Sequence, residues 1–161
     1  MADNSVLIPF KSHSHDHQRC VKSALVDAEK TCKAAGLKLT KIRRQVLELV
    51  WNSHAPIKAY EILEHLQKNN PRAVPPTVYR ALDFLQDAGL IHRIESLNAF
   101  IGCGDPNEPH SGQFLICSTC GAAAELNEPQ ITMLINSHAS QLGFQAVQPL
   151  IEIRGLCPRC Q

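Results

Sequence analysis

The sequence predicts an α+β fold in two parts, an N-terminal winged helix-turn-helix and a small α/β domain. Three observations predict it. Four stretches with apolar residues at helical spacing come first, and two short strand-like stretches follow them. The composition changes beyond a proline-rich segment in the middle of the chain. The second part carries two Cys-x-x-Cys motifs, one near its start and one at its end.

Composition limits the class of protein. The chain has 161 residues, of which 44% are apolar, enough for one large or two small soluble domains. No apolar run has the length of a membrane span. Seven cysteines, an odd number that includes two Cys-x-x-Cys pairs, fit a reducing cytoplasm better than a disulfide scaffold. Residues 1–100 carry 14 Lys and Arg against 10 Asp and Glu, and this basic first part suggests a nucleic-acid partner.

Residues 1–19 are expected to form a disordered arm. The arm contains His13, His15 and His17 at alternate positions, and Cys20 follows. These side chains could also bind a metal, so the role of the arm stays open.

Four helices are expected in the first domain, which we place at residues 20–103. They cover 21–35, 41–51, 58–68 and the stretch from Pro75 to the stop at Gly89. In the fourth helix, Val78, Leu82 and Leu85 form the inward stripe. Two strands, 90–95 and 99–103, then form a hairpin.

Helices followed by a two-stranded wing make a winged helix-turn-helix, whose second turn helix enters the DNA major groove. Here that is the fourth helix. The candidate DNA contacts lie at its start and around the start of the second helix: Lys38, Lys41, Arg43, Thr77, Tyr79 and Arg80.

A hinge is expected at residues 104–112, and the α/β domain at 113–161. Strands are predicted at 113–117, 121–126 and 150–154, with a helix from Pro129 to Leu142. A unit this small is expected to need a metal or a partner subunit for stability.

The two Cys-x-x-Cys motifs predict a closed zinc site. Two tight turns can direct four thiolates at one ion, and the site leaves no open position for catalysis. The ligands would be Cys117, Cys120, Cys157 and Cys160. A single such motif can instead be a redox pair or a disulfide. The presence of two copies makes both alternatives less favoured than zinc.

Four more candidate ligands lie near the hinge: His92, Cys103, His110 and Glu125. Each has an ordinary alternative as a core histidine, a buried cysteine, a loop histidine or a surface glutamate. Together they offer one sulfur, two nitrogens and one oxygen, a complete tetrahedral set for zinc. Metal binding there would lock the first domain against the second and act as a switch.

Residues 75–85, residues 89–96 and the paired Cys-x-x-Cys motifs closely resemble the ferric uptake regulator family, and within it the zinc-responsive regulators. The resemblance covers Val21 to Cys160. It implies that the winged helix binds DNA, that the α/β domain dimerises, and that each chain holds two zinc ions. The structural zinc would be held by the four cysteines, and the regulatory zinc by His92, Cys103, His110 and Glu125.

The expected function is a zinc-responsive transcriptional repressor in the cytoplasm. It would bind inverted-repeat operator DNA as a zinc-loaded homodimer and repress zinc-uptake genes, with no membrane and no small-molecule substrate as partner. A zinc hydrolase or deaminase is the enzyme alternative, but the sequence lacks HExxH and the deaminase His-x-Glu motif. An iron or peroxide sensor of the same family is the third possibility, although thiolate with imidazole favours zinc.

Overall fold

The computed structural model describes residues 5–10, 16–52, 55–108, 110–147 and 149–161. The chain divides into two compact units. The helical unit is residues 11–108, and the sheet unit combines residues 1–10 with 109–161. The first residues of the chain thus belong with its last third.

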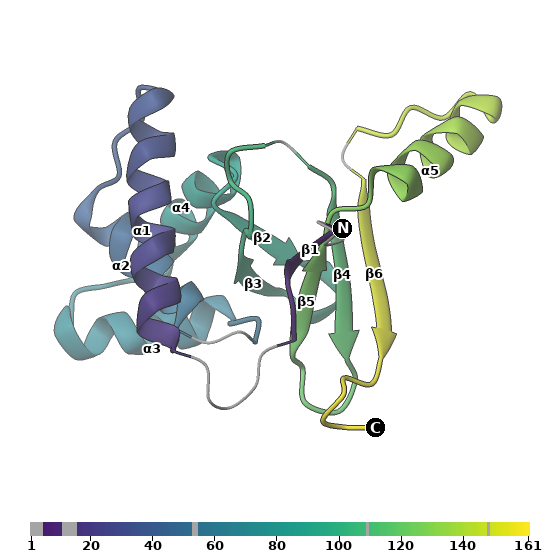
Figure 1. Ribbon diagram of the computed structural model, residues 1–161. Helices are drawn as coiled ribbons and strands as arrows, with labels where there is room; N and C mark the ends of the chain where they lie inside the picture. The colour runs from purple at the N-terminus through teal and green to yellow at the C-terminus, as the bar shows by residue number, and fades with distance from the viewer. Residues whose placement is uncertain (1–4, 11–15, 53–54, 109, 148) are drawn as a thin grey trace. The chain divides into compact units, whose positions relative to one another are not determined.

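The helical unit contains the four expected helices: α1 (His17–Ala34), α2 (Lys41–Trp51), α3 (Ala59–Asn69) and α4 (Pro75–Asp87) (Figure 1). Helix α1 begins four residues earlier than predicted. The carboxylate of Asp16 caps it by accepting hydrogen bonds from the backbone N–H groups of Gln18 and Arg19, at 3.0 and 3.3 Å. No helix in the described ranges is long and apolar enough to cross a membrane.

Apolar side chains from all four helices form one core. Val46 and Val50 from α2 and Ile62 from α3 are fully buried there. The predicted inward stripe of α4 is confirmed, since Val78, Leu82 and Leu85 are all buried. Burying this stripe fixes which face of α4 remains exposed.

The wing consists of β2 (Ile91–Ile94) and β3 (Ala99–Gly102), joined by the 3₁₀ turn η1 (Glu95–Leu97). The strands pair antiparallel as predicted. The backbone of Ile57 pairs with Phe100 through two hydrogen bonds, of 2.9 and 2.8 Å. A Cβ at Gly102 would collide with the Trp51 ring, so α2 packs directly on the end of β3.

The sheet unit contains β4 (Gly112–Cys117), β5 (Ala123–Leu126), α5 (Pro129–Gln141) and β6 (Leu150–Gly155). With β1 they form a four-stranded sheet in the order β1-β5-β4-β6 (Figure 1). Strand β4 is antiparallel to β5 and parallel to β6. The parallel pair brings two distant chain segments to one end of the sheet.

Strand β1 (Val6–Ile8) was not predicted. It pairs antiparallel with β5, Val6 opposite Leu126 and Ile8 opposite Glu125. Within the described residues, the structure therefore differs from the disordered arm expected over 1–19. Three consecutive apolar residues, two of them β-branched, cover the open edge of β5. Helix α1 begins at His17, whereas His13 and His15 of the expected arm lie outside the described residues.

Candidate metal centres and DNA-facing surface

The first centre forms where β4 and β6 end side by side. Cys117, the last residue of β4, is the register partner of Gly155, the last residue of β6. A tight turn follows each strand. The N–H of Gly121 donates to the carbonyl of Cys117 at 2.9 Å, and the N–H of Cys160 donates to that of Cys157 at 2.9 Å. The two Cys-x-x-Cys turns are therefore held next to each other.

The four sulfur atoms of this cluster lie within 4.8 Å of one another. Those of Cys120 and Cys157 are 3.7 Å apart. A tetrahedral zinc site with Zn–S bonds of about 2.3 Å requires sulfur separations of about 3.8 Å. The cluster of Cys117, Cys120, Cys157 and Cys160 predicted from the sequence is thus present, with dimensions that fit zinc.

The thiols of this cluster differ in acidity. Hydrogen bonds from the backbone N–H groups of Cys120 and Cys157 lower the pKa of Cys117 to about 6. Although burial raises the pKa of Cys157, the backbone N–H of Arg159 and neighbouring thiols lower it overall. The adjacent Cys157 sulfur raises the pKa of Cys160 to about 12. Without a cation, ionisation of some thiols in the cluster opposes ionisation of the others. A bound metal would stabilise all four thiolates together.

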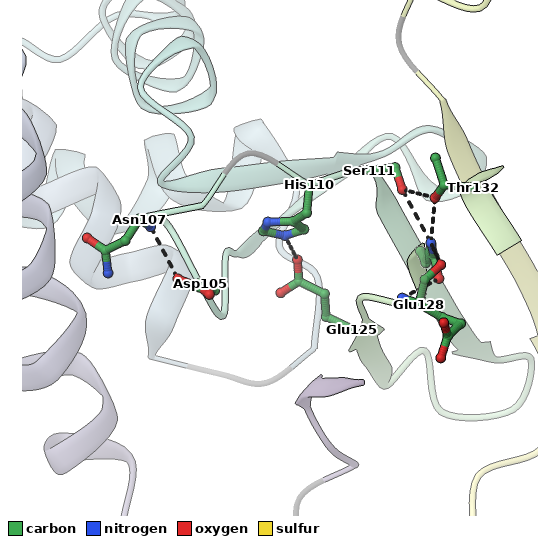
Figure 2. A network of polar contacts seen from close by, with 8 residues as sticks. Asp105, Asn107, His110, Ser111, Glu125, Glu128 and Thr132 are labelled. Carbon is green, nitrogen blue, oxygen red and sulfur yellow. Dashed lines mark hydrogen bonds and ion pairs between the residues drawn. The ribbon is translucent and has the colours of Figure 1, made fainter. Parts of the chain in front are cut away.

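The sheet unit also holds one pair of the expected regulatory ligands (Figure 2). Nε2 of His110 lies 2.8 Å from Oε1 of Glu125. Their side chains are only 3% and 0% exposed. A fully buried carboxylate requires strong polar partners or a metal, because burial of an isolated charge is costly. This pair offers one nitrogen and one oxygen ligand.

The helical unit holds the other pair. His92 lies on β2, half-buried, and Cys103 follows β3 and is 3% exposed. Their ligand atoms lie within 4.8 Å of each other. The N–H of Cys103 donates to the carbonyl of Leu90 at 3.1 Å, which continues the wing ladder and fixes the backbone of the cysteine. This pair offers one sulfur and one nitrogen, donors that suit zinc.

The candidate DNA contacts lie on the helical unit. Tyr79 and Arg80 on α4 are exposed, and Thr77 is half-buried. Lys38 in the loop before α2 and Lys41 at the start of α2 are also exposed. The side chain of Tyr79 is 52% exposed and is therefore accessible to a partner. The burial of the α4 stripe turns Tyr79 and Arg80 outward.

Arg43 has a different environment from the other candidates. Its guanidinium lies 3.5 Å from the centroid of the Phe84 ring. Nη1 donates a hydrogen bond of 2.6 Å to the carbonyl of Lys38. Arg43 therefore connects the loop before α2 with α4, a packing role that the sequence analysis did not anticipate.

Sequence reasoning missed two features, one exposed and one buried. Tyr60 near the start of α3 is 58% exposed, with the ammonium of Lys58 6.0 Å from its ring centroid. The sequence signal for this exposed pair is an aromatic and a cationic residue two positions apart at the start of a helix. Gln113, inside an otherwise apolar strand, is buried with several hydrogen bonds. A polar residue in such a run signals a buried network.

The chain is similar to known proteins over most of its length. The profile of the ferric uptake regulator family matches residues 34–154. The zinc uptake regulation protein of Escherichia coli (strain K12) is 38% identical over 137 residues, 84% of this chain and 80% of that protein. The peroxide-responsive repressor PerR of Staphylococcus aureus (strain Mu50) is 25% identical over 144 residues, 88% of this chain and 94% of that protein.

Among solved structures, a zinc uptake regulator complexed with zinc and DNA superposes with a TM-score of 0.83 at 37% identity. The match covers 87% of this chain and 94% of that one. The fold, with its winged helix-turn-helix and second domain, is therefore the one predicted from the sequence.

Proposed function

We propose that this chain, which belongs to the ferric uptake regulator family, is a zinc-responsive transcriptional repressor of zinc-uptake genes. It would act in the cytoplasm as a homodimer on inverted-repeat operator DNA. Members of this family are regulators rather than enzymes, in agreement with the absence of HExxH from the sequence. The observation that carries the proposal is the likeness to a zinc uptake regulator bound to zinc and DNA, together with two donor sets suited to zinc.

The four-cysteine cluster would hold a structural zinc. Cys117, Cys120, Cys157 and Cys160 leave no open coordination position, so the ion would cross-link the ends of β4 and β6. Metal binding of this kind contributes directly to folding free energy. The small sheet unit, most of whose α5 and β6 side chains are exposed, would depend on it.

The two ligand pairs would together hold the regulatory zinc. His92 and Cys103 would contribute from the helical unit, and His110 and Glu125 from the sheet unit. A ligand set divided between two units is satisfied only when the units adopt one arrangement. Zinc would then select the arrangement that binds DNA, since a ligand shifts an equilibrium by its differential affinity.

Helix α4 would read the operator. Tyr79 and Arg80 would contact bases in the major groove, with Thr77, Lys38 and Lys41 on phosphates or the adjacent groove. Arg43 would act mainly by fixing α4 through Phe84, with phosphate contact as a second role. The net positive charge of residues 1–100 supports the proposal that this surface binds DNA.

The sheet unit would form the dimer. Helix α5 buries none of its described side chains. Its apolar residue Leu134, for example, is 62% exposed. Phe144 after α5 and Ile153 on β6 are also exposed. Strand β6 lies at the edge of the sheet. An apolar helix and edge strand of this kind require a partner surface, and a second copy would provide one in an inverted-repeat complex.

A metal competition experiment tests the proposal. Binding of the dimer to a labelled inverted-repeat operator is measured while free zinc, iron(II) or manganese(II) is titrated. We expect zinc to produce specific binding at far lower free concentrations than the other two metals, with two zinc ions per chain at saturation. Iron(II) or peroxide dependence would instead support another sensor of the family, and zinc-independent binding would contradict the switch.

A further inference from the structure

A buried polar network surrounds the start of β4 in the sheet unit (Figure 2). Its centre is Gln113, which is 2% exposed. Its Nε2 group donates to the carbonyl of Glu128 at 3.0 Å and to Oγ1 of Thr132 at 3.0 Å. A longer contact of 3.3 Å reaches Oγ of Ser111, and Oε1 accepts from the N–H of Glu128 at 3.1 Å. The amide is thus fully satisfied, as a buried polar group must be.

This network fixes the first turn of α5 on the sheet. Glu128 is the N-cap residue of α5, and its carboxylate accepts from the N–H of Gln130 at 3.1 Å. Ser5 of the N-terminal segment donates to the same carboxylate at 3.1 Å. Because α5 buries none of its described side chains, these hydrogen bonds contribute much of its attachment.

The same stretch of backbone holds a candidate regulatory ligand. His110 immediately precedes Ser111, whose hydroxyl lies 2.7 Å from that of Thr132. Phe114 is opposite Glu125 in the ladder and Gln113 is opposite Leu126. Side chains alternate along a strand, so Gln113 and Glu125 occupy opposite faces of the sheet. Residues 110–111 therefore connect the ligand pair on one face with the network on the other.

We propose that Gln113 and Thr132 are positioning residues that couple the His110–Glu125 ligand pair to α5, so that zinc binding there and dimerisation strengthen each other. The inference rests on the proposed function and adds a physical connection between the regulatory zinc site and the dimer. If a metal replaced the hydrogen bond between His110 and Glu125, these two side chains would hold it and fix the backbone at 110–111. Ser111 and Gln113 would then fix the start of α5.

Thermodynamic linkage makes the effect reciprocal. If zinc at this pair tightens the dimer by some factor, dimerisation must tighten zinc by the same factor. Coupling of this kind is commonly about 5- to 150-fold. We expect a roughly 10-fold decrease in the dimer dissociation constant on filling the second site, and a loss of most of that change when the network is broken.

A matched pair of substitutions at one position tests the coupling. Thr132→Val removes the hydroxyl and keeps the shape of the side chain, whereas Thr132→Ser keeps the hydroxyl. The dimer dissociation constant is measured by sedimentation in the absence of DNA, first with one zinc per chain and then with two. We expect zinc to tighten the dimers of the wild type and Thr132→Ser, and to leave the dissociation constant of Thr132→Val nearly unchanged.

Gln113→Leu provides a second test, with zinc content and circular dichroism checked for each variant. It should bind the four-cysteine zinc normally and also lack the zinc-dependent tightening. The inference is overturned if Thr132→Val responds to zinc like the wild type, if both threonine variants weaken the dimer equally at both zinc levels, or if the wild-type dimer is insensitive to the second zinc. Zinc-dependent operator binding by the wild type is scored separately, so failure of the coupling is distinguishable from failure of the zinc switch.

Discussion

Exposed residues at the start of α4 are the ones that we propose to contact DNA bases. Tyr79 and Arg80 point outward because Val78 and Leu82 turn inward at helical spacing. An arginine on such a helix can form two hydrogen bonds to one guanine. A lysine beside the recognition helix instead binds phosphate as a point charge. Arg80 and Lys41 are therefore expected to contribute differently to binding.

Arg80→Ala is expected to weaken operator binding by about 1–3 kcal/mol while leaving non-specific binding nearly intact. Lys41→Ala should weaken binding to all sequences alike and reduce the salt dependence by about one unit of slope. Fluorescence anisotropy with operator and scrambled duplexes across a salt series measures both. Equal losses on the two duplexes for Arg80→Ala would mean that another residue reads the bases.

A substitution at Arg43 can separate the packing of its side chain on Phe84 from its contact with phosphate. Arg43→Lys keeps the charge but loses the flat stack on Phe84 and the geometry of the bond to the Lys38 carbonyl. We expect the free energy of unfolding to fall by about 1 kcal/mol, from a weakened cation–π contact and hydrogen bond. Urea unfolding of the zinc-loaded protein measures it. Unchanged stability with unchanged DNA affinity would show that only the charge matters.

Elements with strong local signals were predictable from the sequence. Helix α2 begins and ends at the expected residues, because Ile42, Val46 and Val50 recur at helical spacing and Thr40 lies at its start. The hydroxyl of Thr40, however, makes no capping bond in the described structure. The cysteine turns were also predictable, because short-range spacing determines them.

Strand β1 could not be predicted on the same grounds. Its partner, β5, lies more than a hundred residues away, and three apolar residues alone do not indicate a strand. The Gln113 network depends likewise on Glu128 and Thr132, which reach it only after α5 packs. The residue types of the candidate ligands were evident from the sequence, while their burial and distances required the tertiary fold.

A zinc ion held by the two cysteine turns would cross-link β4 and β6, so its loss should affect the whole sheet unit. Cys160→Ser is expected to remove one zinc ion per chain and to shift the protein to monomer, because the unit has little core of its own. Metal analysis and sedimentation check this result. Cys20→Ser, outside both ligand sets, is the control and should keep its zinc and its dimer. A zinc-replete dimeric Cys160→Ser protein would contradict the structural assignment.

At the scale of the whole molecule, the four proposed regulatory ligands are divided between two units. His92 and Cys103 belong to one unit, and His110 and Glu125 belong to the other. Without a metal, the two α4 helices of a dimer would rarely match half-sites roughly one helical turn apart. The apparent DNA affinity then falls by the fraction of dimers in the competent arrangement.

The most direct test compares the wild type with Cys103→Ser in operator binding across a free-zinc titration. The substitution removes the soft ligand with little change in volume, and cobalt substitution reports a thiolate band for the second site. We predict a folded Cys103→Ser dimer that keeps its four-cysteine zinc, lacks that band, and gains no DNA affinity as zinc rises. If Cys103→Ser binds the operator with an unshifted zinc response, Cys103 is a core residue and the zinc switch is elsewhere.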